Sequence, residues 1–377
     1  MSIKKIIVSL LTGCLLLTLL AGCGTKGEAG QTTAATTRVI TDQAGNQVTI
    51  PTEINRVVIT SVTPLPALFC LFMGSADKLV GMYPASKRTA QYSIVSQLVP
   101  GIMDVDTGFY DGTAINVEEL IKLKPDVVFY FAGKDDEKKA IESAGLPAVA
   151  FDPFYDGNNG GDGNNIVEVA HQWINFLGEI FQMPDKADKF HAQQQKIEQL
   201  VAGRLSGITD DKRPNTLIVS NYNDSALMVG GTQTADYWIR YAGGTNAAIE
   251  TGKPMAKVNM EQIYQWNPDV IILNSFSAYT ADDIINSTAA QGQDWSGLQA
   301  VKDRRVYKMP LGTYYWYATC YEGPLMLLWM ATKLQPAAFA DIDMTQYTRD
   351  YFKDVLDVTL TDQQLDLIFN PLPDAHM

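Results

Sequence analysis

Two glutamates occupy matching places in a stretch of sequence that occurs twice, and they could make charged contacts with a partner. The first copy, residues 116–128, reads Asn-Val-Glu-Glu-Leu-Ile-Lys-Leu-Lys-Pro-Asp-Val-Val, and the second, residues 259–271, reads Asn-Met-Glu-Gln-Ile-Tyr-Gln-Trp-Asn-Pro-Asp-Val-Ile. Glu118 and Glu261 lie at the third position of each copy. Carboxylates repeated on two related surfaces suit a partner with two-fold symmetry. The alternative is that each glutamate only stabilises the N-terminus of a helix.

A second set of residues could line a ligand cleft. Tyr314, Tyr315, Trp316 and Tyr317 are consecutive, and four consecutive aromatic side chains cannot all face a core. Aromatic walls suit a large flat or aromatic metal complex; the alternative is that two rings belong to the core and two to the surface. Further candidates follow predicted strand ends: Thr63, Tyr83, Lys87, Arg88, Phe109, Tyr110, Asn221, Tyr222 and Thr232. Lys87 and Arg88 could meet an anionic group of a ligand, or could simply be solvated.

The sequence offers little for metal binding or catalysis. Its three histidines, His171, His191 and His376, are not placed near the expected cleft, so no bare metal site is predicted. Residues 156–167 match only part of a calcium loop, because position 12 is a valine. Nucleophile-elbow, zinc-protease and Walker motifs are absent, so no catalytic residue is predicted. A net charge of −13 argues against nucleic acid as a partner.

Strands alternate with helices around both copies of the repeat. We expect strands at 56–60, 79–82, 127–131, 148–151, 215–221, 270–273 and 306–309, and helices at 65–73, 134–143 and 234–242. This alternation predicts an α/β fold of two Rossmann-like lobes with mostly parallel sheets and a ligand cleft between the lobes. The lobes are expected at 38–165 and 206–377. Residues 166–205 are expected to form a long helical crossing between them, interrupted at Met183-Pro184.

The first residues read as an export signal. Lys4 and Lys5 precede an apolar stretch, and small residues then lead to Cys23. Residues 1–22 are typical of a bacterial lipoprotein signal peptide, in which case Cys23 would carry the lipid and hold the protein on the outer face of the cell membrane. The alternative is an ordinary signal peptide with an incidental cysteine. Residues 23–37 lack periodicity and predict a flexible tether.

Cys70 and Cys320 are the cysteines of the body of the chain. Each lies in an apolar and aromatic stretch, which favours two buried thiols. In an oxidising compartment a disulfide that joins the two halves is the alternative.

From about Arg38 to the C-terminus, the sequence resembles the extracytoplasmic solute-binding proteins of ATP-driven (ABC) importers, in the group that binds iron–siderophores, haem and cobalamin. The resemblance is carried by the segments 39–51, Arg56-Val-Val, Gly74 with 79–81, both Glu…Pro-Asp-Val elements, 242–246, 295–307 and Pro310. It implies two Rossmann-like lobes joined by a long helix and a cleft that closes little. It also implies that Glu118 and Glu261 dock on arginines of the membrane permease.

The predicted function is therefore capture of a metal chelate outside the cell and its delivery to a permease dimer with ATPase subunits. Aromatic and polar loops from both lobes would enclose the chelate, no cofactor is expected to be intrinsic, and the protein is expected to be a monomer. The alternatives are a molybdate- or tungstate-binding protein of the same fold, which would hold its ligand with amides and hydroxyls, and a surface lipoprotein hydrolase or structural protein.

Overall fold

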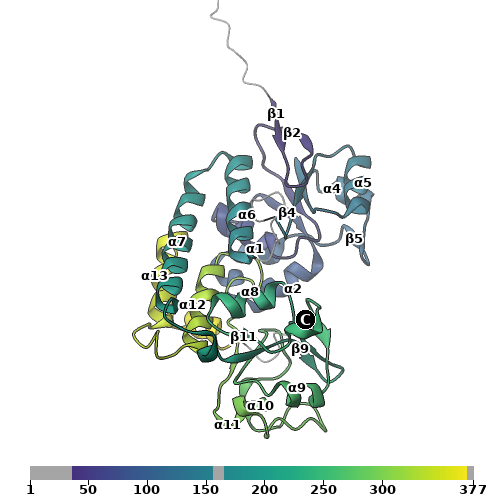
Figure 1. Cartoon of the computed structure of the whole chain (residues 1–377). Coiled ribbons are helices and arrows are strands. Elements are labelled where there is room, and N and C mark those ends of the chain that lie inside the picture. Colours follow the sequence, from purple (N-terminus) through teal and green to yellow (C-terminus); the bar gives the residue numbers. More distant parts are fainter. Residues whose placement is uncertain (1–35, 156–164, 372–377) are drawn as a thin grey trace, which may run out of the picture. The chain divides into compact units, whose positions relative to one another are not determined.

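The computed structural model describes residues 36–155 and 165–371 (Figure 1). The predicted signal peptide, Cys23, nearly all of the predicted tether, the partial calcium loop up to residue 164 and His376 lie outside the described residues. Within the described ranges, no helix is both long enough and apolar enough to cross a membrane.

The N-terminal half contains a four-stranded parallel sheet in the order β4-β3-β7-β8. Its strands are β3 (Val57–Ile59), β4 (Leu79–Met82), β7 (Val127–Phe131) and β8 (Ala148–Phe151). The helices are α1 (Leu65–Met73), α2 (Pro84–Tyr92), α3 (Val95–Leu98), α4 (Val117–Lys122) and α5 (Asp135–Ser143). Two small hairpins complete this half: β1 (Thr37–Thr41) with β2 (Gln47–Pro51), and β5 (Tyr110–Asp111) with β6 (Ala114–Ile115).

The C-terminal half contains a six-stranded mixed sheet in which β11, β13 and β14 run parallel to their neighbours. Its strands are β9 (Asn215–Asn223), β10 (Ala226–Val229), β11 (Thr245–Asn246), β12 (Ala256–Lys257), β13 (Val270–Leu273) and β14 (Val306–Lys308). The helices are α8 (Thr234–Tyr241), α9 (Met260–Trp266), α10 (Ala281–Ile285), α11 (Gln299–Lys302), α12 (Gly323–Leu334), α13 (Met344–Leu356) and α14 (Asp362–Phe369).

The parallel parts of the two sheets share one topology. The order β4-β3-β7-β8 in the first sheet corresponds to β11-β9-β13-β14 in the second. In each, the chain leaves a central strand to one side and then returns to its other side, and ligands of such sheets bind where this reversal occurs. The predicted α/β fold with two lobes is therefore confirmed, although the antiparallel strands β10 and β12 were not predicted.

The repeated segments fold alike. Each begins with an asparagine N-cap: Asn116 Oδ1 accepts a hydrogen bond from the backbone N–H of Glu119 at 3.2 Å, and Asn259 Oδ1 accepts one from Gln262 at 3.0 Å. The short helices α4 and α9 follow, and each leads into a strand, β7 or β13. The two copies of the repeat therefore have the same order of cap, helix and strand.

The crossing region folds as two helices, α6 (Ile166–Phe181) and α7 (Asp185–Leu205), which lie side by side (Figure 1). The predicted break is present: Gln182 has a left-handed backbone with φ of 57°, and Met183 and Pro184 follow it. Only α7 is the long connecting helix, at about 30 Å for its 21 residues. Near its start Lys186 Nζ donates to the backbone oxygen of Phe72 in α1, and near its end Arg204 pairs with Asp341.

The two cysteines of the described chain are both buried and free. Burial raises the pKa of the Cys70 thiol to about 12, so this thiol stays protonated at neutral pH. The predicted pair of buried thiols is confirmed, and the disulfide alternative is wrong.

Candidate ligand-binding cleft

Two neighbouring cavities lie at the carboxyl ends of the parallel strands. The β9–β13 cavity, of about 370 Å³, is lined by Ser220, Asn221, Thr232, Thr234, Pro254, Met255, Asn274, Phe276, Tyr315 and Tyr317. The β3–β7 cavity, of about 230 Å³, is lined by Ser61, Val62, Thr63, Pro64, Phe131, Pro153, Phe154, Ile166, Trp173, Thr234, Tyr315, Tyr317, Ala318 and Thr319. Thr234, Tyr315 and Tyr317 belong to both linings, so the cavities form two parts of one cleft.

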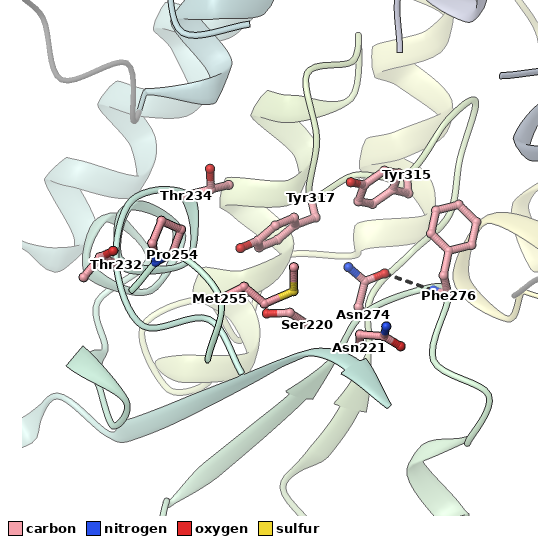
Figure 2. Close-up of a pocket in the computed structure, with 10 residues that line it drawn as sticks. All are labelled: Ser220, Asn221, Thr232, Thr234, Pro254, Met255, Asn274, Phe276, Tyr315 and Tyr317. Carbon is pink, nitrogen blue, oxygen red and sulfur yellow. Dashed lines mark hydrogen bonds between the residues drawn. The ribbon is translucent and has the colours of Figure 1, made fainter. Parts of the chain in front are cut away.

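The ends of two strands supply the polar wall of the β9–β13 cavity. Ser220 and Asn221 lie in the last part of β9, and Asn274 directly follows β13 (Figure 2). The Asn274 side chain is 7% exposed, and its Oδ1 accepts a hydrogen bond from the backbone N–H of Phe276 at 3.0 Å. This bond fixes the side-chain amide and holds the backbone that presents the Phe276 ring at the cavity.

A loop beside the antiparallel strands closes another side of the same cavity. The backbone N–H of Thr232 donates to the oxygen of Lys253 at 2.9 Å, which holds Thr232 beside Pro254 and Met255. Gly230 permits this close approach: a Cβ at this position would lie 2.4 Å from Ala235 Cβ and 3.2 Å from Ser220 Oγ. A larger residue at position 230 would therefore displace α8 or the polar wall.

The aromatic run divides by position. Tyr314 and Trp316 are buried, whereas Tyr315 and Tyr317 line the cleft with nearly parallel rings 6.4 Å apart. Trp316 instead packs edge-on against Phe369 of α14, with ring centroids 5.7 Å apart. The result combines the two expectations for this run. Two rings belong to the core, as the alternative had it, and the other two form walls of the cavities.

A buried glutamate holds the loop that carries these rings. Glu322 is fully buried; its Oε1 accepts from the backbone N–H of Thr313 and its Oε2 from the Thr313 hydroxyl, both at 2.7 Å. Burial raises the pKa of the Glu322 carboxyl. Gly312 is required beside it, because a Cβ there would lie 2.5 Å from Glu322 Oε1 and 2.3 Å from Trp316 Nε1.

Both halves of the chain contribute further bonds to the aromatic loop. Ser93 Oγ donates to the backbone oxygen of Thr313 at 3.0 Å, and Trp238 Nε1 donates to the backbone oxygen of Tyr317 at 3.0 Å. Trp238 is itself fully buried. The two tyrosine rings therefore stand on a loop that is tied to the structure at both ends.

The described residues that line the cleft carry no charged side chain. None of the described residues that line either cavity is an Asp, Glu, Lys, Arg or His. Burial raises the pKa of Tyr315 and of Tyr317, so both phenols keep their protons at physiological pH. The lining can donate hydrogen bonds from hydroxyls and amides, but it brings no charge of its own to a ligand.

The structure brings together part of the predicted cleft. Thr63 lines the β3–β7 cavity, Asn221 and Thr232 line the β9–β13 cavity, and Tyr315 and Tyr317 line both.

The other predicted cleft residues lie outside the two cavities. Those that are buried are Phe109, Tyr222, Tyr314 and Trp316. Tyr83 packs edge-on against Tyr110, whose hydroxyl donates to Glu137 at 3.5 Å. Lys87 Nζ donates to the backbone oxygen of Val105 at 2.9 Å, and Arg88 is exposed.

Sequence reasoning missed several residues that line the cleft, above all Ser61, Ser220, Asn274, Phe131 and Phe276. A signal was available for some of them. Residues 57–61 and 216–220 are both short, mostly apolar runs that end in serine, and Asn274 lies 143 positions after Phe131, the offset of the repeat. Comparing the predicted strands of the two lobes position by position would have found Ser61, Ser220 and Asn274.

The two predicted docking glutamates lie on the exposed faces of α4 and α9. Neither has a hydrogen-bond or ion-pair partner among the described residues, whereas the neighbouring Glu119 pairs with Lys122 at 2.6 Å. One helical turn after each glutamate stands an exposed apolar or aromatic residue, Ile121 at 48% and Tyr264 at 39% exposure.

No group of three or more His, Cys, Asp or Glu side chains that could hold a metal ion occurs in the described part of the chain. His171 and His191 stack on each other between α6 and α7, with ring centroids 4.1 Å apart, and neither lines a cleft cavity.

Two lobes of the same topology, a connecting helix and a cleft at the strand ends whose described lining is uncharged are typical of a solute-binding protein. The chain belongs to the Periplasmic binding protein family, which matches residues 57–311. It is similar in structure to a periplasmic solute-binding protein from Veillonella parvula, with 32% identity, a TM-score of 0.78 and coverage of 89% of this chain and 97% of that one.

Two further relatives connect the chain with ABC transporters. The molybdate-binding protein MolA of Haemophilus influenzae is 28% identical over 84% of this chain and 90% of its own length. The molybdate-bound MolA structure has a TM-score of 0.71 at 27% identity and covers 86% of this chain and 99% of that chain. YvrC of Bacillus subtilis, an uncharacterized ABC transporter substrate-binding lipoprotein, is 24% identical over 77% of this chain and 85% of its own length.

The protein is therefore an extracytoplasmic solute-binding protein of this family, and its relatives include substrate-binding proteins of ABC transporters. Members of this family bind solutes for transport and are not enzymes.

Proposed function

We propose that the cleft binds a metal chelate and delivers it to the permease. The observation that carries this proposal is the combination of size and lining: two joined cavities of about 370 and 230 Å³, walled by aromatic rings and without a charged side chain among the described residues. Pockets of roughly 300–1,000 Å³ suit ligands of drug size. Stacked rings such as Tyr315 and Tyr317 suit the flat or aromatic groups of a chelator. The metal would arrive as cargo inside its chelate.

Molybdate or tungstate is the second candidate. It is favoured by the similarity to MolA along most of the chain and by the hydroxyl and amide groups of the polar wall. The size of the cavity speaks against it, since a tetrahedral oxyanion needs only about 100 Å³, at roughly 30 Å³ for each oxygen-sized group. Such an anion would leave most of the cleft unfilled.

Ligand identification tests both candidates. Freshly purified protein is examined by native mass spectrometry and visible absorption, and then titrated calorimetrically with molybdate, a ferric catecholate, a ferric hydroxamate, haem and cyanocobalamin. A coloured bound species, or submicromolar affinity for one of the chelates, supports the first proposal. Tight binding of molybdate alone overturns it in favour of the second.

We propose that Glu118 and Glu261 dock the loaded protein on two basic sites of the permease. The exposure of both carboxylates, their lack of partners among the described residues and their equivalent positions in the two lobes support this. Ile121 and Tyr264, one turn further along each helix, would add an apolar contact beside each charge.

We propose that Cys23 carries a lipid that anchors the protein on the extracytoplasmic face of a bacterial membrane. The small residues before Cys23 and the apolar stretch that precedes them support this. Cell fractionation tests it: a Cys23→Ser variant is expected to leave the membrane fraction, and continued membrane retention would contradict the anchor.

We also propose that the protein acts as a monomer, with lobes at 38–165 and 206–377 and the crossing at 166–205. The shared topology of the two sheets and the connecting helix α7 support these boundaries. Size-exclusion chromatography with light scattering tests the oligomeric state.

A further inference from the structure

We infer that Ser61 and Ser220, at equivalent positions of the two lobes, act with Asn274 as the hydrogen-bond donors that hold oxygen atoms of the ligand. This inference deepens the proposed function and rests on it, because it concerns the same cleft. The ligand chemistry it names is a set of oxygen acceptors, supplied either by the metal-binding groups of a chelate or by a free oxyanion.

The strand registers establish that the two serines are equivalent. In the first sheet Val57 lies opposite Val127, and in the second sheet Thr216 lies opposite Val270, which is the counterpart of Val127 in the repeat. Four residues after Val57 is Ser61, and four residues after Thr216 is Ser220. Both serines therefore stand at the same point of the reversal in strand order, where such sheets bind ligands.

Both hydroxyls lack a partner. Each Oγ has almost no accessible surface and makes no hydrogen bond with a described residue, and among the described side chains with such an atom only Ser61 and Ser220 line the cleft. Rotation of the side chain to another staggered rotamer would turn either hydroxyl toward the cavity that its residue lines. Serines that are buried as whole residues have partners, as in Ser275, whose Oγ donates to the backbone oxygen of Pro310 at 2.9 Å. Because buried polar groups in proteins are nearly always hydrogen-bonded, two unsatisfied hydroxyls at equivalent places in a cleft indicate a missing acceptor.

Asn274 adds a third donor. It is nine-tenths buried, and its Oδ1 is occupied by the backbone N–H of Phe276. The oxygen is thereby directed toward Phe276, while the amide nitrogen points to the cavity beside Tyr317 (Figure 2). No hydrogen bond from this nitrogen occurs among the described residues, so it is free to donate to a ligand.

The chemistry of these donors defines what they recognise. Two hydroxyls and an amide NH₂ offer hydrogens without positive charge, and no cation lines the cleft in the described chain. They therefore select a ligand by the placement of its oxygen atoms rather than by net charge. Since Ser61 lines the β3–β7 cavity and Ser220 the β9–β13 cavity, a ligand held by both must lie where the two cavities meet.

The test compares Ser61→Ala, Ser220→Ala and the double variant with Ser275→Ala, a buried serine whose hydroxyl already has a partner. The probes are the five ligands named above, with affinity measured by calorimetry and stability by thermal unfolding. Each single change is expected to weaken binding about tenfold and the double change about a hundredfold, with the unfolding midpoint unchanged or higher. Ser275→Ala is expected to lower the midpoint and leave affinity within about twofold.

The outcomes are distinguishable. If a probe binds the wild-type protein and all serine variants bind it equally well, this inference is overturned while the proposed function stands. A lowered midpoint with unchanged affinity would likewise assign the serines a structural role only. If none of the five probes binds the wild-type protein, the proposed function fails and this inference fails with it. A loss of affinity for molybdate identifies a free oxyanion as the source of the oxygens, and a loss for a chelate identifies the chelate.

Discussion

The two lobes present the same backbone to the cleft but different side chains. In the first lobe the strand ends supply Ser61 and, beside it, Phe131; in the second they supply Ser220 and Asn274. The serine is common to both, while the neighbouring position is an aromatic ring in one lobe and an amide in the other. The two lobes thus present equivalent backbone positions to a ligand. At one of these positions Phe131 gives the first lobe an apolar surface, whereas Asn274 gives the second lobe a polar one.

The lobes also differ in what surrounds those positions. The second sheet continues into the antiparallel strands β10 and β12, and the loops beside them bring Thr232, Pro254 and Met255 to the cavity. The first sheet has no such extension in the described chain. The second lobe therefore encloses the larger of the two cleft cavities, and we expect it to contribute more of the binding free energy.

The largest effect, on ligand uptake by cells, is expected when the equivalent glutamates of both lobes are removed. A variant with both Glu118→Ala and Glu261→Ala should reduce ligand uptake by cells about a hundredfold or more, because paired charges at an interface contribute roughly 2–5 kcal/mol each. Each single variant should lose a smaller part. Ligand affinity of the purified protein should not change, and a loss of affinity would contradict the docking role.

Glu119→Ala provides a matched control for the docking prediction, since this neighbour on α4 is already paired with Lys122. We expect its uptake to stay close to that of the wild-type protein. An equal loss in this control would indicate a general effect of acidic charge rather than a specific contact.

Exchanging the residues that distinguish the lobes tests their division of roles. Asn274→Phe should weaken binding tenfold to a hundredfold, because loss of a buried donor costs roughly 1–3 kcal/mol. Phe131→Asn should weaken it only about threefold, since it removes apolar cover and no donor. Calorimetry of both variants checks this, and equal losses would show that the lobes contribute alike.

Neighbouring rings of the aromatic loop should give opposite results. Tyr317→Ala removes a ring shared by both cavities and is expected to weaken binding about tenfold with a small change in stability. Trp316→Ala removes a fully buried ring and should lower the free energy of unfolding by about 3–5 kcal/mol. Denaturant titration and calorimetry together separate the two effects, and a stable Trp316→Ala protein with lost affinity would reverse the assignment.

The smallest effect is expected for the pH dependence of stability, through Glu168 in helix α6. Burial alone would raise the pKa of Glu168, but hydrogen bonds from His171, Gln172 and Gln194 outweigh it and lower this pKa to about 2. Since the ordinary value is 4.5, the ionised carboxylate stabilises the fold above pH 4.5, and this contribution is lost as the pH falls toward 2. Thermal unfolding at pH 7 and pH 3 should show a smaller acid loss for Glu168→Gln than for the wild-type protein; an identical loss would contradict this account.

Much of the architecture was predictable from local sequence. Strands β4, β7, β8 and β13 and helix α1 have the predicted bounds, because short apolar runs between glycine, proline and polar residues are strong local signals. The N-caps at Asn116 and Asn259 were predictable for the same reason. The antiparallel strands β10 and β12 were not, since both are short and β12 pairs with a strand that lies far from it in the chain.

The sequence by itself determined the two related lobes, the break between α6 and α7, the family and the presence of aromatic residues at the cleft. These features follow from repetition, apolar periodicity and residue type, all of which can be recognised along the sequence before the fold is known. The sequence could not determine which two of the four consecutive rings face the cleft, because the loop that carries them is irregular. The orientation of this loop is set by hydrogen bonds with Ser93 and Trp238, which lie far away in the chain, and with Glu322.

Only the tertiary structure decided which polar groups face the cleft without a partner. Comparing the two lobes along the sequence marks Ser61, Ser220 and Asn274 as positions at strand ends, but it does not show which of their polar groups lack a partner. Their significance comes from strand register, which places residues far apart in sequence opposite each other, and from burial, which makes an unpaired hydroxyl costly. Both properties arise from packing between segments and exist only once the chain has folded.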